Sequence, residues 1–199
     1  MRPDDNKGIS LTELIVATVA VGVIMVGVVS VDQAMRQSHQ GTSRNALVSM
    51  KTSAIMLHIT KNVQLTNGYR TESGSIDGIR TNIANTLCVR KEDPSNITPG
   101  NYSDDVWACY TLNGTNMNFC QSAAGGAAAA CGAGTVLGTA TSFTVQLSND
   151  SDPVTGQFYV EITVINRFDP AAGKNTFDNP EITLTSRISP PGLSSSIGP

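Results

Sequence analysis

The first third of the chain is an apolar run followed by a polar segment with helical spacing. Residues 9–31 are apolar apart from a few hydroxyl groups and the carboxylate of Glu13, and a run of this length can cross a bilayer. Residues 32–65 are polar and contain no proline, and apolar residues recur there at steps of three and four: Leu47, Met50, Ala54 and Leu57. This spacing predicts a helix over residues 9–65, about 85 Å long, whose apolar stripe covers a sheet.

Beyond residue 65 the apolar positions recur with a period of two, as in half-buried strands. The alternation covers residues 106–112, 143–147, 158–164 and 182–188, and the polar, turn-rich residues 149–156 indicate a hairpin loop. Thr66-Asn67-Gly68 is a turn signal that ends the helix. The expected fold is α+β, with a long N-terminal helix packed on an antiparallel sheet. The globular head spans residues 66–188 and a flexible tail spans residues 189–199.

The position of Glu13 needs an explanation, because a carboxylate at bilayer depth costs about 2.5 to 3.5 kcal/mol on insertion scales. A cut after Gly8 would make Ile9 the N-terminus, with an α-amino group of pKa about 7.7 to 8.0 that is mostly protonated at neutral pH. Ile9 and Glu13 lie four residues apart on one helix face. The amine and the carboxylate could therefore pair within one chain or between neighbouring chains, and only the second arrangement builds a polymer.

At these residues the chain resembles the type IV pilin and pseudopilin family. The match is a short leader at residues 1–8 ending in Gly8, a hydrophobic first mature residue, Ile9, and Glu13 as the fifth mature residue before a long apolar helix. The resemblance implies that a prepilin peptidase cuts between Gly8 and Ile9 on the cytoplasmic side and methylates the new amino terminus of Ile9. It also implies that Glu13 helps to dock an incoming subunit against the terminal amine of a subunit already in the filament.

The same resemblance implies a location and partners. The helix would be held in the inner membrane by residues 9–31, with the head outside the cytoplasm, and would later lie in the core of a periplasmic or cell-surface filament. The partners would be sister subunits, the prepilin peptidase and the inner-membrane assembly platform. Two departures favour a minor over a dominant subunit: Ser30 stands where many major pilins have a proline, and Ser10-Leu11-Thr12 is more polar than the usual opening. A retractable pilus, a type II secretion pseudopilus and a DNA-uptake filament all remain open.

An ordinary secretory signal sequence is the alternative. Residues 14–31 form an apolar h-region, and Val28-Val29-Ser30 is a passable small-residue cleavage site. The chain would then be a secreted or membrane-anchored extracytoplasmic binding domain. Against this, Glu13 interrupts the start of the h-region, and the run exceeds the roughly 7 to 15 residues typical of such regions.

Four cysteines lie in the head, and translocation across the membrane would place them in an oxidising compartment. The expected number of disulfides is therefore two, with three possible connectivities. We favour Cys88 with Cys109, because that bond could join neighbouring strands. We favour Cys120 with Cys131, because that bond would close the Ala/Gly tract at residues 123–134.

Other chemistries have little support in the sequence. Zinc is disfavoured because there is no C-x-x-C pair and His39 and His58 lie on the helix, remote from the cysteines. Calcium could use the oxygens of Asp104-Asp105 or of Asn149, Asp150 and Asp152, but neither cluster has the spacing of a calcium loop. We therefore predict no metal and no cofactor.

No catalytic motif occurs, so we predict a structural protein and not an enzyme. The net charge of −3 gives no basic footprint for nucleic acid.

Overall fold

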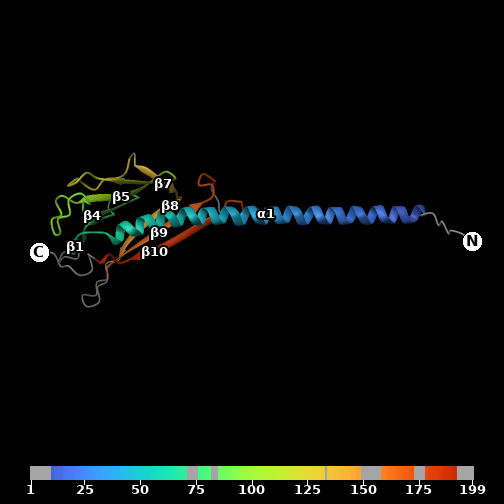
Figure 1. The fold of residues 1–199 in the computed structure, drawn as a ribbon, viewed down its shortest axis with the longest axis horizontal. Helices are drawn as coiled ribbons and strands as arrows, with labels where there is room; N and C mark the ends of the chain where they lie inside the picture. Colours follow the sequence, from blue (N-terminus) through green and yellow to red (C-terminus); the bar gives the residue numbers. More distant parts are fainter. Residues whose placement is uncertain are drawn as a thin grey trace, which may run out of the picture. The chain divides into compact units, whose positions relative to one another are not determined.

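The computed structural model describes residues 10–70, 76–81, 85–132, 134–148, 158–172 and 178–191. The chain divides into two compact units, Met1–Ser43 and Arg44–Pro199, and helix α1 (Leu11–Gln64) supplies residues to both (Figure 1). The leader with its predicted cut between Gly8 and Ile9 lies outside the described residues. The predicted loop at 149–156 and the tail beyond residue 191 lie outside them as well.

In the first unit the described residues are almost entirely the N-terminal part of α1. Its large apolar side chains from Leu11 to Val31 are between 52% and 76% exposed. A helix that is apolar on all sides normally lies in lipid or among other helices. The apolar side chains of this helix therefore form an extended surface, and no other described residue of the first unit covers it.

The second unit, which we call the head unit, contains the strands. A two-stranded sheet pairs β1 (Tyr69–Arg70) with β2 (Ile76–Asp77). A five-stranded sheet follows the chain order β3 (Ile79–Arg80), β4 (Thr86–Lys91), β5 (Val106–Asn113), β6 (Asn116–Gln121) and β7 (Thr135–Thr139). A three-stranded sheet holds β8 (Ser142–Ser148), β9 (Tyr159–Arg167) and β10 (Glu181–Ile188), with β9 in the centre.

All strand pairs of these sheets are antiparallel, so the α+β class is confirmed. The predicted strands correspond to β5, β8, β9 and β10. We expected one sheet, whereas the described residues form three. Strands β1, β2, β3, β4, β6 and β7 were not predicted. Strands β4 and β6 flank β5. Strand β4 lacks the alternating pattern of a half-buried strand because Leu87, Cys88 and Val89 are all buried.

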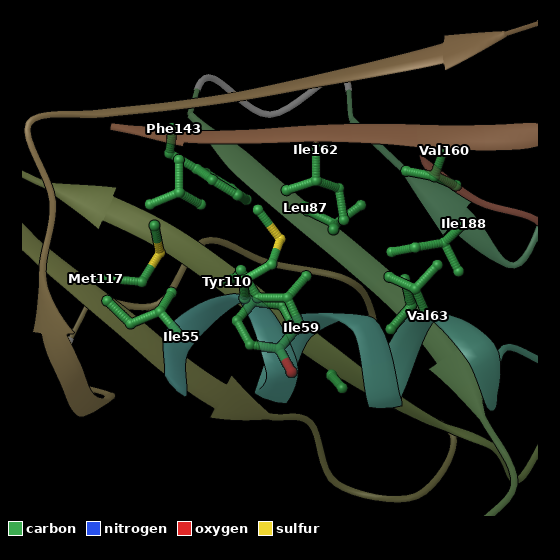
Figure 2. Packing of buried hydrophobic residues seen from close by; sticks show 14 of the residues in the cluster. Ile55, Ile59, Val63, Leu87, Tyr110, Met117, Phe143, Val160, Ile162 and Ile188 are labelled. Atoms are coloured by element: carbon green, nitrogen blue, oxygen red, sulfur yellow. The ribbon is translucent and has the colours of Figure 1, made fainter. Parts of the chain in front are cut away.

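The core of the head unit lies between the C-terminal part of α1 and the sheets (Figure 2). Ile55, Ile59 and Val63 of the helix are at most 1% exposed. They belong to one buried cluster with side chains of both large sheets, including Leu87, Tyr110, Met117, Phe143, Val160 and Ile162. Gly138 on β7 brings the backbone close to the helix, since a Cβ there would lie 3.0 Å from Cδ1 of Ile55. Each buried Ile or Val side chain contributes about 1.5 to 3 kcal/mol through burial.

The prediction of which helix face meets the sheet was wrong. Of the predicted stripe, Leu47 is 42% exposed and Met50 and Leu57 are each 71% exposed. The face that packs on the sheets is nearly opposite on the helix and carries Val48, Thr52, Ile55, Ile59 and Val63. Both sets have steps of three and four residues, so periodicity alone could not separate them. The stripe Leu47, Met50, Ala54 and Leu57 is called the outer stripe below.

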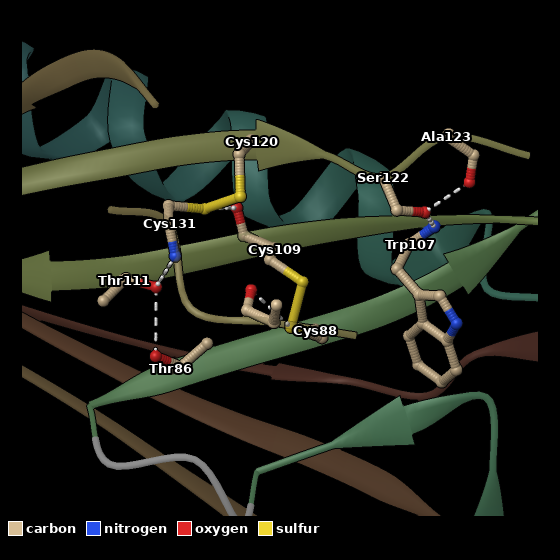
Figure 3. Close-up of a disulfide and its surroundings, with 10 residues drawn as sticks. Thr86, Cys88, Trp107, Cys109, Thr111, Cys120, Ser122, Ala123 and Cys131 are labelled. Carbon is tan, nitrogen blue, oxygen red and sulfur yellow. Dashed lines mark hydrogen bonds between the residues drawn. A yellow bond between two sulfur atoms is a disulfide. The ribbon is translucent and has the colours of Figure 1, made fainter. Parts of the chain in front are cut away.

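The two disulfides join Cys88 to Cys109 and Cys120 to Cys131 (Figure 3), the pairing favoured from the sequence. The first links the neighbouring strands β4 and β5, as expected. The second closes the segment between β6 and β7, which contains the Ala/Gly tract. Trp107 packs beside the half-cystines in a second buried cluster, so the sheet has apolar contacts on this side also.

Candidate functional site

Helix α1 begins with a capping box formed by Ser10 and Glu13. The backbone N–H of Glu13 donates to Oγ of Ser10 at 3.3 Å, and the backbone N–H of Ser10 donates to Oε2 of Glu13 at 3.0 Å. The first helical bond follows, from the N–H of Leu14 to the carbonyl oxygen of Ser10 at 3.2 Å. These reciprocal bonds satisfy two backbone donors that the start of a helix otherwise leaves without partners.

The hydroxyl groups beside Glu13 complete this cap. Oγ of Ser10 donates to Oε2 of Glu13 at 3.2 Å and lies 2.9 Å from Oγ1 of Thr12. Both bonds to the carboxylate therefore end on Oε2. Within the described part of the chain no group donates to Oε1 of Glu13. That oxygen can accept a hydrogen bond from a group in another chain.

The sequence contained a signal for this cap that our sequence analysis missed. Ser10-Leu11-Thr12-Glu13 is an S-x-x-E pattern directly before an apolar run, which is the sequence form of a capping box. The polar opening is therefore part of the helix start. Glu13 also has a local role at the start of this helix, because its negative charge is stabilised by the positive end of the helix dipole.

The capping box is compatible with the predicted cut. The cap uses the backbone N–H of Ser10, which remains a peptide amide if the chain is cut between Gly8 and Ile9. The new ammonium group would then sit on the residue directly before the cap. Gly8 and Ile9 lie outside the described residues, so their geometry stays a prediction.

The helix that carries Glu13 is apolar and long enough to span a membrane. Among the described residues it is the one helix with this property, and its most apolar stretch has a mean hydropathy of 2.8. Gly22 and Gly27 lie within it, and a Cβ at either position would meet no atom within 4 Å. Such small residues allow the backbone of a second helix to approach closely in lipid.

A buried polar network joins the helix of the head unit to its sheet. The hydroxyl of Tyr110 accepts from Nδ2 of Asn62 at 2.6 Å and donates to the carbonyl oxygen of His58 at 3.1 Å. Nδ1 of His58 lies 2.9 Å from the same hydroxyl, and Nζ of Lys91 donates to Oδ1 of Asn62 at 3.0 Å. The His58 ring packs edge-on against Phe119, with 4.8 Å between centroids. His58 is therefore part of the packing between the helix and the sheet.

Burial and charge change the pKa values in this network. Burial lowers the pKa of His58, and the positive charges of Lys91 and Lys61 lower it further. Burial raises the pKa of the Tyr110 phenol. Burial also lowers the pKa of Lys91, with a contribution from Lys61. The environment thus favours neutral His58, because each nearby cation disfavours a second positive charge.

The acidic residues considered for calcium have other partners. Oδ2 of Asp104 accepts from Nδ2 of Asn96 and Oγ1 of Thr98, both at 2.7 Å. The side chain of Asp105 is 1% exposed and lies 3.6 Å from Nε of Arg90. Among the described residues no group of three or more His, Cys, Asp or Glu side chains could hold a metal ion. The second predicted cluster, at Asn149, Asp150 and Asp152, lies outside these residues.

Comparison of the chain with protein-family models, with curated proteins and with solved structures finds no match.

Proposed function

We propose that this chain is a minor pilin or pseudopilin. It is a structural subunit and not an enzyme. A prepilin peptidase cuts it between Gly8 and Ile9, and its N-terminal helix then assembles into a type IV pilus or a type II secretion pseudopilus. Before assembly the helix is held in the inner membrane with the head unit outside the cytoplasm. The observation that carries this proposal is the placement of Glu13 at the start of an exposed apolar helix.

The electrostatics of Glu13 support a partner in another chain. The capping box satisfies part of the hydrogen-bonding capacity of the carboxylate, but it contains no formal positive charge. A charged group at membrane depth is costly and normally pairs with an opposite charge. The ammonium group of a neighbouring, cleaved chain supplies that charge, and Oε1 is available to accept its hydrogen bond.

The outer stripe supports assembly through the helix in the head unit as well. Leu47, Met50 and Leu57 remain exposed although the opposite face of the same helix is fully packed. The sheets of the head unit cover one apolar face of this helix, so the second apolar face can be buried against another molecule. Helices of neighbouring subunits would cover both this stripe and the apolar side chains of residues 11–31.

Two variants separate docking from capping. Glu13→Gln removes the charge but keeps a side chain that can complete a capping box, whereas Ser10→Ala keeps the charge and removes the capping hydroxyl. If Glu13 docks subunits, Glu13→Gln lowers incorporation into sheared filaments at least about tenfold, the effect of about 1.4 kcal/mol. Ser10→Ala then has a small effect. Quantitative immunoblotting of filament and membrane fractions measures both.

Asp32→Asn is the matched control, because Asp32 is an exposed acid on the same helix and pairs with Arg36 at 2.9 Å. It should assemble normally. All three variants should remain in the membrane after alkaline extraction, which shows that any loss concerns assembly and not insertion. Normal incorporation of Glu13→Gln together with failure of Ser10→Ala would show that Glu13 acts as a helix cap, and the docking role would be rejected.

A further inference from the structure

Three of the four half-cystines stand in one row across adjacent strands. Cys109 on β5 is the register partner of Cys88 on β4 and also of Cys120 on β6. Residues directly opposite one another in antiparallel strands place their side chains on the same face. Cys109 therefore has a half-cystine on each side. Cys131 reaches the same place from the segment before β7, with its Sγ 3.2 Å from the carbonyl oxygen of Cys109.

This register allows a second partner for Cys109. Directly opposed Cα atoms in antiparallel strands lie about 4.5 to 5.5 Å apart, which falls within the range of about 4.4 to 6.8 Å found in disulfides. A bond between Cys109 and Cys120 would therefore fit the β5–β6 pair as folded. In the final structure Cys109 bonds to Cys88 instead.

The hairpin favours the alternative bond early in folding. Cys120 and Cys131 are 11 residues apart in the sequence, and Cys109 and Cys120 have the same separation, so the entropy of loop closure does not distinguish the two bonds. Strands β5 and β6 hold Cys109 opposite Cys120 through a tight turn at Gly114, whose φ is 60°. Residues 122–131, which lead from the end of β6 to Cys131, contain no strand. Cys88 and Cys109 are 21 residues apart, and their bond requires β4 to dock first.

We propose that oxidative folding of this chain passes through a Cys109–Cys120 disulfide and that Cys109 then changes partner to Cys88. The row of β4, β5 and β6 is thus a site of thiol–disulfide exchange. This exchange is independent of the filament function, since it follows from strand register, the turn at Gly114 and the separation of the cysteines in the sequence.

The exchange balances with an external disulfide as the oxidant. One molecule of oxidised glutathione takes two electrons from the thiols of Cys109 and Cys120, which become a disulfide, and two molecules of reduced glutathione are released. The thiolate of Cys88 then attacks Sγ of Cys109, the Cys109–Cys120 bond breaks, and Cys120 leaves as a thiolate. A second molecule of oxidised glutathione joins Cys120 to Cys131 in the same way.

Two double variants of the full chain in detergent test the register. Cys88→Ser/Cys131→Ser leaves Cys109 and Cys120, and oxidised glutathione should join them with loss of both free thiols. Cys109→Ser/Cys131→Ser leaves Cys88 and Cys120, which are two strands apart, at about twice the strand spacing of 4.7 to 4.9 Å. This control should keep both thiols or carry them as mixed disulfides with glutathione. Maleimide labelling and peptide mass spectrometry distinguish these products.

Wild-type protein provides the second test, which does not depend on folding of the variants. Reduced, denatured chain is refolded with oxidised glutathione, quenched with acid at successive times and mapped by mass spectrometry. The Cys109–Cys120 peptide should be the main species with one protein disulfide at early times and should disappear as Cys88–Cys109 forms. The proposal is overturned if Cys88–Cys109 or Cys120–Cys131 forms first without it, or if both double variants crosslink equally.

Discussion

The contact between helix α1 and strand β5 is mostly apolar but contains the polar groups of Tyr110, Asn62 and His58. The hydroxyl of Tyr110 has partners on the helix for both donation and acceptance, and the Tyr110 side chain is fully buried. A buried polar group that loses its partner costs about 1 to 3 kcal/mol. The network therefore allows little freedom in how α1 is rotated against β5, and its charge state affects the stability of the head unit.

We predict that the head unit loses stability as the pH falls below about 6.5, with a contribution from His58. The folded pKa of His58 is lowered by burial and by Lys91 and Lys61. Between that lowered value and 6.5, the unfolded chain binds a proton that the folded chain does not, so stability rises with pH. His58→Gln should remove this part of the pH dependence. Denaturant unfolding in detergent at several pH values from 5 to 8 measures it.

His39→Gln is the control, because His39 lies on the same helix but is exposed. Its pH profile should follow that of the wild type. An unchanged profile for His58→Gln would mean that the protonation of His58 is not linked to folding, and the electrostatic account of the network would be wrong.

At the level of the element, the C-terminal part of α1 has two apolar faces with different partners. The face of Ile55 packs on both large sheets of the head unit, whereas the outer stripe contacts neither closely enough to be buried. A large-to-small change on the inner face creates a cavity in the core. The same change on the outer face removes little or no packing within one chain. The two faces can therefore be tested separately.

Ile55→Ala and Leu57→Ala form a matched pair on opposite sides of one helical turn. We predict that Ile55→Ala destabilises the head unit by about 2 to 5 kcal/mol and that Leu57→Ala changes its stability by at most about 0.5 kcal/mol. Leu57→Ala should instead lower incorporation into filaments. Unfolding of the purified chain and quantification of sheared filaments give the two readouts. Equal destabilisation by both variants would place Leu57 in the core and remove the outer stripe as an assembly surface.

At the level of the whole molecule, the proposed function depends on which residues the mature chain contains. We predict that mature protein has the intact mass of residues 9–199 with one added methyl group and two disulfides. Peptide mapping should find N-methylated Ile9 as the first residue. A mature chain that begins at Met1 would contradict processing, and a chain that begins at Val31 would indicate an ordinary signal sequence.

Much of the architecture followed from periodicity along the chain. The helix was predictable because apolar residues recur there at steps of three and four. Strands β5, β8, β9 and β10 were predictable because apolar and polar residues alternate along them. The disulfide pairing followed from neighbouring strands and a closed loop. Strand β4 was missed because it is buried on both faces, and the capping box was missed although the spacing of Ser10 and Glu13 contained it.

The sequence alone determined the composition of the helix, the position of its one carboxylate within the apolar run, and the number of disulfides. These properties are local, since they depend on residues a few positions apart or on a count. Tertiary structure decided which apolar face of the helix is buried. The stripe that contains Ile55 and the stripe that contains Leu57 have the same spacing in the sequence, and only contact with the sheets distinguishes them. It also decided that Cys109 lies between Cys88 and Cys120, because strand register is set by contacts between residues distant in the chain.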